Sequence, residues 1–153
     1  MQNIPEEEAR SLVSRPLICE EIEEWEPLKV QPGTSACGVG VLDESGQSVR
    51  MYVEFIHRAS HKTKITIYLF TLFKRQAYGK ERVYQLEVTQ TPKRVKDLHK
   101  LSHEHMGSLR TLGGVDWADW DYEDVLAYFC AATNITFRPK PSHPDEFKLT
   151  ADR

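Results

Sequence analysis

Three consecutive segments between residues 48 and 90 have the spacing of β-strands, and short polar turns join them. In residues 48–57 every second side chain is apolar, namely Val49, Met51, Val53 and Phe55. Residues 82–90 alternate in the same way, whereas residues 64–73 are apolar or aromatic on both faces. Because strand side chains point alternately to opposite faces, this spacing predicts an antiparallel meander whose middle strand is covered by a helix.

A helix is predicted on each side of these strands. Pro5 and the glutamates that follow it are typical of a helix start, because carboxylates there face the positive end of the helix dipole. Towards the C-terminus, Asp121 is a predicted N-cap. The helix after it has one face formed by Tyr122, Val125, Leu126, Phe129 and Thr133.

Shorter segments are assigned from weaker patterns. Leu17, Ile18 and Ile22 are interpreted as a second short helix near the N-terminus. Residues 101–106 are interpreted as one more short strand, and residues 135–137 as a docking segment or an edge strand.

These elements predict a single α+β domain over residues 1–138. Its antiparallel sheet is expected to have about five strands, with the short N-terminal helix and the amphipathic C-terminal helix on one face. Residues 139–153 are proline-rich and charged, and are expected to form a flexible tail. The chain of 153 residues is 40% hydrophobic and 28% charged, which favours a folded core over disorder.

Other sequence features exclude several classes of protein. No apolar run approaches the roughly 18 residues of a membrane span, and the acidic N-terminus does not have the pattern of a secretory signal. The three cysteines (Cys19, Cys37 and Cys130) are widely spaced, which argues against a disulfide scaffold and a cysteine zinc site. We therefore expect a cytoplasmic protein with no membrane partner. No cofactor is predicted, because the chain has no P-loop and no dinucleotide fingerprint.

The net charge of −3 hides a strong segregation of charge. Residues 1–26 contain eight acids and two bases, and residues 111–130 contain five acids and no bases. Between them, residues 57–110 contain twelve Lys or Arg and four acids. Such a basic middle is either a phosphate-binding face or a surface that the protein's own acidic segments neutralise. The sequence leaves both interpretations open.

Three histidines of the basic segment, His99, His103 and His105, lie within seven residues of one another. On a strand, His103 and His105 project from the same face. Imidazole donates and accepts protons near neutral pH, so these three histidines are the candidate catalytic residues for cleaving RNA beside a 2′-hydroxyl. Nearby cations would hold the phosphate and stabilise the transition state: Lys93, Arg94, Lys96, Lys100 and Arg110.

Two other interpretations of the histidines stay open. A His-x-His pair supplies two ligands to a transition metal when a third comes from elsewhere, here from His99, Asp97, His57 or His61. The spacing is weakly specific, and no metal is assigned. Alternatively, the histidines belong to a polar strand edge with no chemical role.

Acidic residues provide a second candidate site, for a protein partner. The candidate partner-binding residues are Glu21, Glu23, Glu24, Asp116, Trp117, Asp119 and Trp120. The two tryptophans are three residues apart, so they either share a helical face and pack in the core, or form an aromatic and acidic lip that binds a basic partner.

The order of elements supports a resemblance. A Tyr-Gln-Leu-Glu-Val strand at residues 84–88 precedes a segment that ends in His105-Met106-Gly107, and the aspartate-capped helix follows. Over roughly residues 47–137 this pattern resembles an uncharacterised family of small prokaryotic domains and, more distantly, the TumE-type toxins of toxin–antitoxin loci. The Arg-Tyr-Asp-Asn run of those toxins is absent. The resemblance implies a role in toxin–antitoxin or phage-defence biology, with His103 and His105 at the His-x-His positions.

Two functions are therefore expected from the sequence. The first is an RNA-cleaving domain of a toxin–antitoxin or phage-defence protein that uses the histidine pair. The alternative is a non-enzymatic interaction module, such as an antitoxin-like partner or an inhibitor of a nucleic-acid-processing complex, that uses its acidic segments. The expected partners are accordingly RNA, a nucleic-acid-associated protein or a cognate protein.

Overall fold

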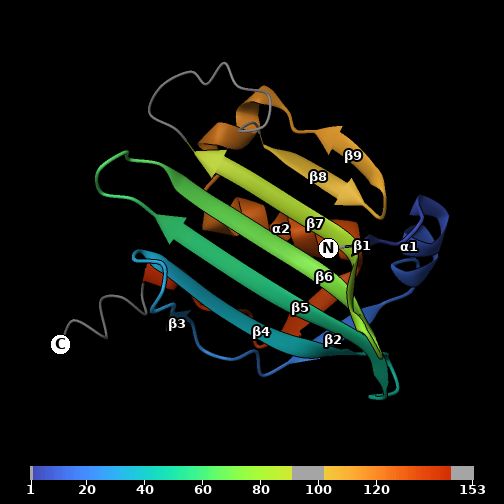
Figure 1. Cartoon of the computed structure of the whole chain (residues 1–153). Coiled ribbons are helices and arrows are strands. Elements are labelled where there is room, and N and C mark those ends of the chain that lie inside the picture. Colours follow the sequence, from blue (N-terminus) through green and yellow to red (C-terminus); the bar gives the residue numbers. More distant parts are fainter. Residues whose placement is uncertain (1, 91–101, 146–153) are drawn as a thin grey trace.

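The computed structural model describes residues 2–90 and 102–145, which form one large curved sheet packed against a helix (Figure 1). Its central strands are β4 (Thr34–Leu42), β5 (Ser48–Ala59), β6 (Thr66–Gln76) and β7 (Gly79–Gln90). Neighbours among them pair antiparallel, which confirms the three segments predicted as strands between residues 48 and 90. The short strands β8 (His103–Met106) and β9 (Leu109–Leu112) extend the sheet beyond β7.

The prediction of a five-strand antiparallel meander is wrong. Within the described residues the sheet has ten strands and is mixed, because two of its pairs are parallel. Strand β1 (Gln2–Asn3) pairs with β7, and β10 (Ile135–Arg138) pairs with β2 (Leu17–Glu20). The two-residue strand β3 (Glu26–Pro27) pairs with β4. These added strands are too short to show alternation in the sequence, and the partners of β1 and β10 lie far along the chain.

Strand β2 replaces the second N-terminal helix that was predicted. Helix α1 (Glu6–Leu12) forms as expected after Pro5. Beyond Pro16, the chain is extended, and Leu17 and Ile18 pair with Ile135 and Thr136 of β10. The short apolar run is therefore stabilised as a strand by a partner more than a hundred residues away. The edge-strand interpretation of residues 135–137 is confirmed.

Helix α2 (Tyr122–Thr133) covers the inner face of the sheet. It begins with a capping box, in which Asp121 and Asp124 each accept a hydrogen bond from the other's backbone N–H. The predicted face is buried: Tyr122, Val125, Leu126, Phe129 and Thr133. Burial of side chains of this size contributes roughly 1.5–3 kcal/mol each, so the helix is held mainly by its contacts with the sheet.

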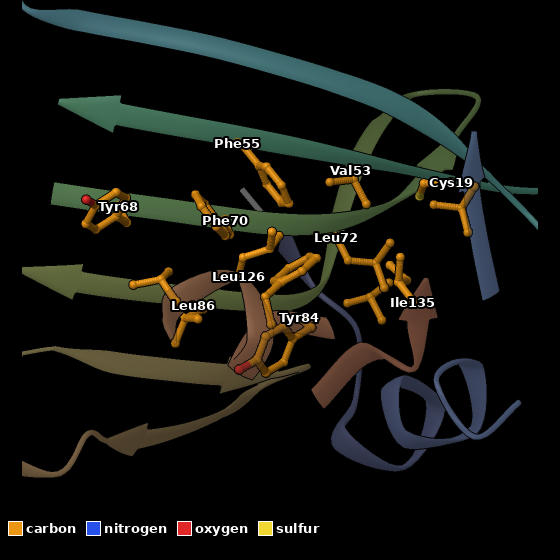
Figure 2. Packing of buried hydrophobic residues seen from close by; sticks show 14 of the residues in the cluster. Cys19, Val53, Phe55, Tyr68, Phe70, Leu72, Tyr84, Leu86, Leu126 and Ile135 are labelled. Atoms are coloured by element: carbon orange, nitrogen blue, oxygen red, sulfur yellow. The ribbon is translucent and has the colours of Figure 1, made fainter. Parts of the chain in front are cut away.

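Aromatic side chains fill the space between α2 and the sheet. Phe55 of β5 stacks on Phe70 of β6 with ring centroids 3.9 Å apart, and the edge of Phe129 meets Phe55 at 5.2 Å. Figure 2 shows Phe55, Phe70 and Leu86 around Leu126 of α2. The inner face of the central strands is thereby closed, and their outer face is the one that carries polar side chains.

Part of the predicted tail also lies against this core. The indole N–H of Trp25 donates to the carbonyl oxygen of Ser142 at 2.9 Å, and the phenol of Tyr122 donates to that of Pro141 at 3.3 Å. Trp25 and Tyr122 are both fully buried. The last eight residues of the tail lie outside the described part of the chain.

Candidate functional site

Strand β8 places the predicted histidine pair on the outer face of the sheet. The two rings are edge to face, with centroids 5.1 Å apart. In the sheet register His103 lies opposite Glu87 of β7, and His105 lies between Gln85 of β7 and Arg110 of β9. The prediction that both histidines project from one strand face is therefore confirmed.

His103 is the more buried of the pair, with 9% of its surface exposed. Its Nδ1 lies 3.3 Å from Glu87 Oε2. A carboxylate at this distance orients an imidazole ring and favours a proton on the facing nitrogen. Glu87 is thus part of the candidate site. The sequence analysis did not single it out, although its outward place in the alternating strand is a usable signal.

His105 is held in its neutral form. Burial, together with the positive charges of Arg82, His103 and Arg110, lowers the pKa of His105 to about 4. At neutral pH the ring therefore has one nitrogen free of a proton. A neutral imidazole beside two guanidinium groups is chemically able to accept a proton while those groups bind an anion.

Arg82 is a second residue of the candidate site that the sequence analysis did not single out. Strict alternation along residues 82–90 places it inward with Tyr84, but the pairing of β6 with β7 contains an irregularity at Leu72 and Phe73. Leu72 lies opposite Tyr84, whereas Phe73 lies opposite Arg82, so the extra residue is Val83. Such a β-bulge reverses the direction of the side chains beyond it, and Arg82 joins the outer face near His105.

Arg82 is positioned by hydrogen bonds to uncharged side chains. Its Nε donates to Asn3 Oδ1 at 2.6 Å, and its Nη1 donates to Gln85 Oε1. Gln85 Nε2 in turn donates to Thr71 Oγ1 at 2.9 Å. Gln85 and Thr71 are 8% and 2% exposed, so this end of the network is shielded from water, whereas the Arg82–Asn3 hydrogen bond is exposed.

Of the predicted phosphate-binding residues, Arg110 is described, and it lies opposite His105. The other predicted members of this site lie outside the described residues: Lys93, Arg94, Lys96, His99 and Lys100. His57 is buried on the inner face beside Trp25 and Tyr68, away from the outer-face pair. Within the described ranges no group of His, Cys, Asp or Glu is arranged to hold a metal ion.

A second candidate site is an acidic pocket beside strands β3, β4 and β5. Glu23 and Glu24, two of the predicted partner-binding residues, line a pocket of about 140 Å³ together with Glu26 and Glu54. Tyr52 also lines this pocket. Its phenol lies against Gly38 and donates a hydrogen bond to Glu23 Oε1 at 3.2 Å. Glu21 is exposed but does not line this pocket.

The other predicted partner-binding residues surround an aromatic cluster. Trp117, in the 3₁₀ helix η2 (Val115–Asp119), is 7% exposed and stacks on Trp120 with ring centroids 4.7 Å apart. Tyr128 of α2 contacts both indoles. Asp116 and Asp119 are exposed on η2. Of the two interpretations left open by the sequence, this packing supports the one in which the indoles anchor the last helix.

Comparison with known proteins found no protein-family model that matches the chain, and no curated protein or solved structure that matches it significantly. No helix in the described part of the chain is long and apolar enough to cross a membrane. The function must therefore be inferred from the chemistry of the two sites.

Proposed function

We propose that the protein is a cytoplasmic RNA-cleaving domain of the toxin–antitoxin or phage-defence type. The observation that carries this proposal is the arrangement on β8 and its neighbours: a neutral His105, a carboxylate-paired His103, and two guanidinium groups on one face. Cleavage beside a 2′-hydroxyl needs a proton acceptor, a proton donor and positive charge around the phosphate. These residues have the chemistry for all three.

In the proposed reaction His105 removes the proton of the 2′-hydroxyl, whose oxygen then attacks the adjacent phosphorus. His103, oriented by Glu87, protonates the 5′-oxygen as its bond to phosphorus breaks. The products are a 2′,3′-cyclic phosphate and a 5′-hydroxyl. Arg82 and Arg110 stabilise the additional negative charge on the phosphate oxygens. A phosphate bound beside the two arginines also offsets their charge, which raises the pKa of His105 and makes it a better base.

The test is the cleavage of single-stranded and hairpin RNA by the purified parent and by His103→Ala, His105→Ala and the double variant. The proposal predicts cyclic phosphate ends for the parent and a rate at least about 100-fold lower for the double variant. His61→Ala is the matched control, since His61 lies in the exposed turn between β5 and β6. Equal rates for the parent and the double variant would refute the catalytic role of the pair.

The acidic pocket favours a second candidate function, a non-enzymatic interaction module. Four carboxylates and a phenol converge there, which suits a Lys or Arg side chain of a basic, nucleic-acid-associated partner. A triple change of Glu21, Glu23 and Glu24 to Lys is expected to abolish salt-sensitive co-purification of such a partner. Glu44→Lys, in the exposed hairpin between β4 and β5, is the control. Retained binding by the triple variant would exclude this function.

A further inference from the structure

We propose that Arg82, His105 and Arg110 form a binding site for a single phosphate group, and that Asn3 of strand β1 positions Arg82 for it. The inference rests on the proposed function, because an RNA phosphate would occupy the same place. The phosphate site can be tested separately from the nuclease activity, since phosphate binding is measurable whether or not RNA is cleaved.

The first supporting observation is the unbalanced charge of Arg82. Its two hydrogen bonds go to the amide oxygens of Asn3 and Gln85, and among the described residues no carboxylate forms an ion pair with it. Arg82 is half-buried, and this burial lowers the pKa of its guanidinium. A guanidinium has five N–H donors, so further donors remain for an anion.

The second observation is that the guanidinium is held in place before any ligand arrives. Gln85 is itself fixed by its hydrogen bond to Thr71, and both are more than nine-tenths buried. Asn3 approaches Arg82 from the other side, on a different strand. Arg82 is therefore oriented from strands β1 and β7, with β6 supporting Gln85. Such preorganisation lowers the entropy that binding costs.

The third observation is the set of charged groups that face the site. Arg82 lies on β7 and Arg110 on β9, and both lower the pKa of His105 on β8 between them. On the face of the histidines, β7 and β8 place one acidic side chain, Glu87, which is engaged with His103, whereas Glu104 lies on the opposite face. Two guanidinium groups offer paired N–H donors that match the oxygens of a phosphate, and the single N–H of the neutral His105 ring is a further donor.

Asn3 reaches this site because the N-terminal segment is itself anchored. The side chain of Ile4 is buried, and its backbone N–H donates to the carbonyl oxygen of Arg82 at 3.3 Å. Asn3 is paired with Arg82 in the parallel register of β1 and β7. The N-terminal residues thus supply a positioning residue, which acts on the phosphate through Arg82.

The experiment is an NMR titration of the full chain with inorganic phosphate and, in a second arm, with an uncleavable 2′-deoxy dinucleotide. The proposal predicts saturable shifts of the His105 ring signals in both arms. It also predicts a rise in the pKa of His105 on saturation, because the anion offsets the charges of Arg82 and Arg110. Arg82→Gln should raise the phosphate Kd at least tenfold. Arg75→Gln, which removes an exposed outer-face charge near Tyr52, should leave it unchanged.

Two changes of Asn3 separate positioning from mere stability. Asn3→Ala frees Arg82 and should raise the phosphate Kd severalfold. Asn3→Asp keeps a hydrogen-bond acceptor but supplies a counter-charge, so the fold should be retained while the Kd rises more than in Asn3→Ala. A purely structural role for Asn3 predicts the opposite order, with Asn3→Asp close to the parent.

The outcomes distinguish this inference from the proposed function. Parent-like phosphate binding by Arg82→Gln, or an equal loss in Arg75→Gln, would overturn the phosphate site. Phosphate binding that depends on Arg82 in a protein that cleaves no RNA would support the site and count against the nuclease. Binding of the dinucleotide but not of inorganic phosphate would show that bases or sugars dominate, and would overturn the site as a single-phosphate site.

Discussion

The phenol of Tyr84 donates a hydrogen bond to Glu104 Oε2 at 2.9 Å, on the side of β8 opposite the two histidines. Glu104 stands between His103 and His105 in the chain and also forms a hydrogen bond with Tyr128 of α2. Its carboxylate raises the pKa of both phenols, in addition to the effect of burial. Strand β8, which contains the two histidines, is therefore held against the core by hydrogen bonds from Tyr84 and Tyr128 to the Glu104 carboxylate.

Tyr84→Phe is expected to destabilise the protein by about 1–3 kcal/mol, because it removes a largely buried hydrogen bond to a carboxylate. Urea unfolding followed by tryptophan fluorescence measures the change. Tyr78→Phe is the control, because Tyr78 is fully exposed in the turn between β6 and β7. Equal midpoints for parent and Tyr84→Phe would show that the Tyr84–Glu104 bond does not stabilise the fold.

Gly107→Ala is expected to be much more costly than Gly46→Ala. Both glycines have positive φ, so alanine costs roughly 1 kcal/mol at either. At Gly107 a Cβ would also come within 2.5 Å of the carbonyl oxygen of Ile4 and 2.7 Å of that of Pro5. Nothing lies within 4 Å of a Cβ at Gly46. The clash adds roughly 1–3 kcal/mol, which thermal unfolding of the two variants detects. Similar losses of stability in both variants would mean that the N-terminal segment shifts to make room for the added methyl group.

Stability should fall as the pH is lowered from about 6.5 to about 4. The pKa of His105 is about 4 in the folded protein and 6.5 as the ordinary value, so the unfolded chain takes up a proton first and is favoured as the pH falls. His105→Gln should flatten this part of the profile, whereas His61→Gln should preserve it. The measurement is the urea midpoint at half-unit steps of pH. A profile unchanged in His105→Gln would contradict the assigned environment of His105.

Trp117→Ala should destabilise the protein by about 3–5 kcal/mol, because the indole is buried against Trp120 and Tyr128. Val115→Ala, at a side chain of the same 3₁₀ helix that is 99% exposed, should change the unfolding free energy by less than about 0.5 kcal/mol. Circular dichroism during chemical unfolding tests both. A small effect of Trp117→Ala would favour a role for Trp117 at a surface rather than in the core.

The parts of the fold that follow local rules were predictable. The capping box of Asp121, the buried face of α2 and the shared face of His103 and His105 all follow from the fixed periods of helix and strand. The strands over residues 48–57 and 82–90 were predictable for the same reason, since each is long enough for its alternation to be read, and residues 64–73 were predictable from their β-branched and aromatic side chains.

The parts of the fold that the sequence did not predict depend on pairing between strands far apart in the chain. Leu17 and Ile18 have no local signal that separates helix from strand, and only their contact with β10 makes them a strand. Strict alternation would put Arg82 on the inner face, but a single extra residue at Val83 reverses the alternation, and no local pattern marks that bulge.

The sequence by itself determined the periodic elements, the segregation of charge and the histidine pair, because these depend on neighbouring residues only. The tertiary structure alone decided that Asn3 and Arg82 join Arg110 beside the histidines, since strands β1 and β7 are brought next to β8 and β9 only by pairing. It also decided which acidic residues converge: Glu54 of β5 joins Glu23, Glu24 and Glu26 across the sheet. Sites built across strands depend on register, and register is a property of the assembled sheet.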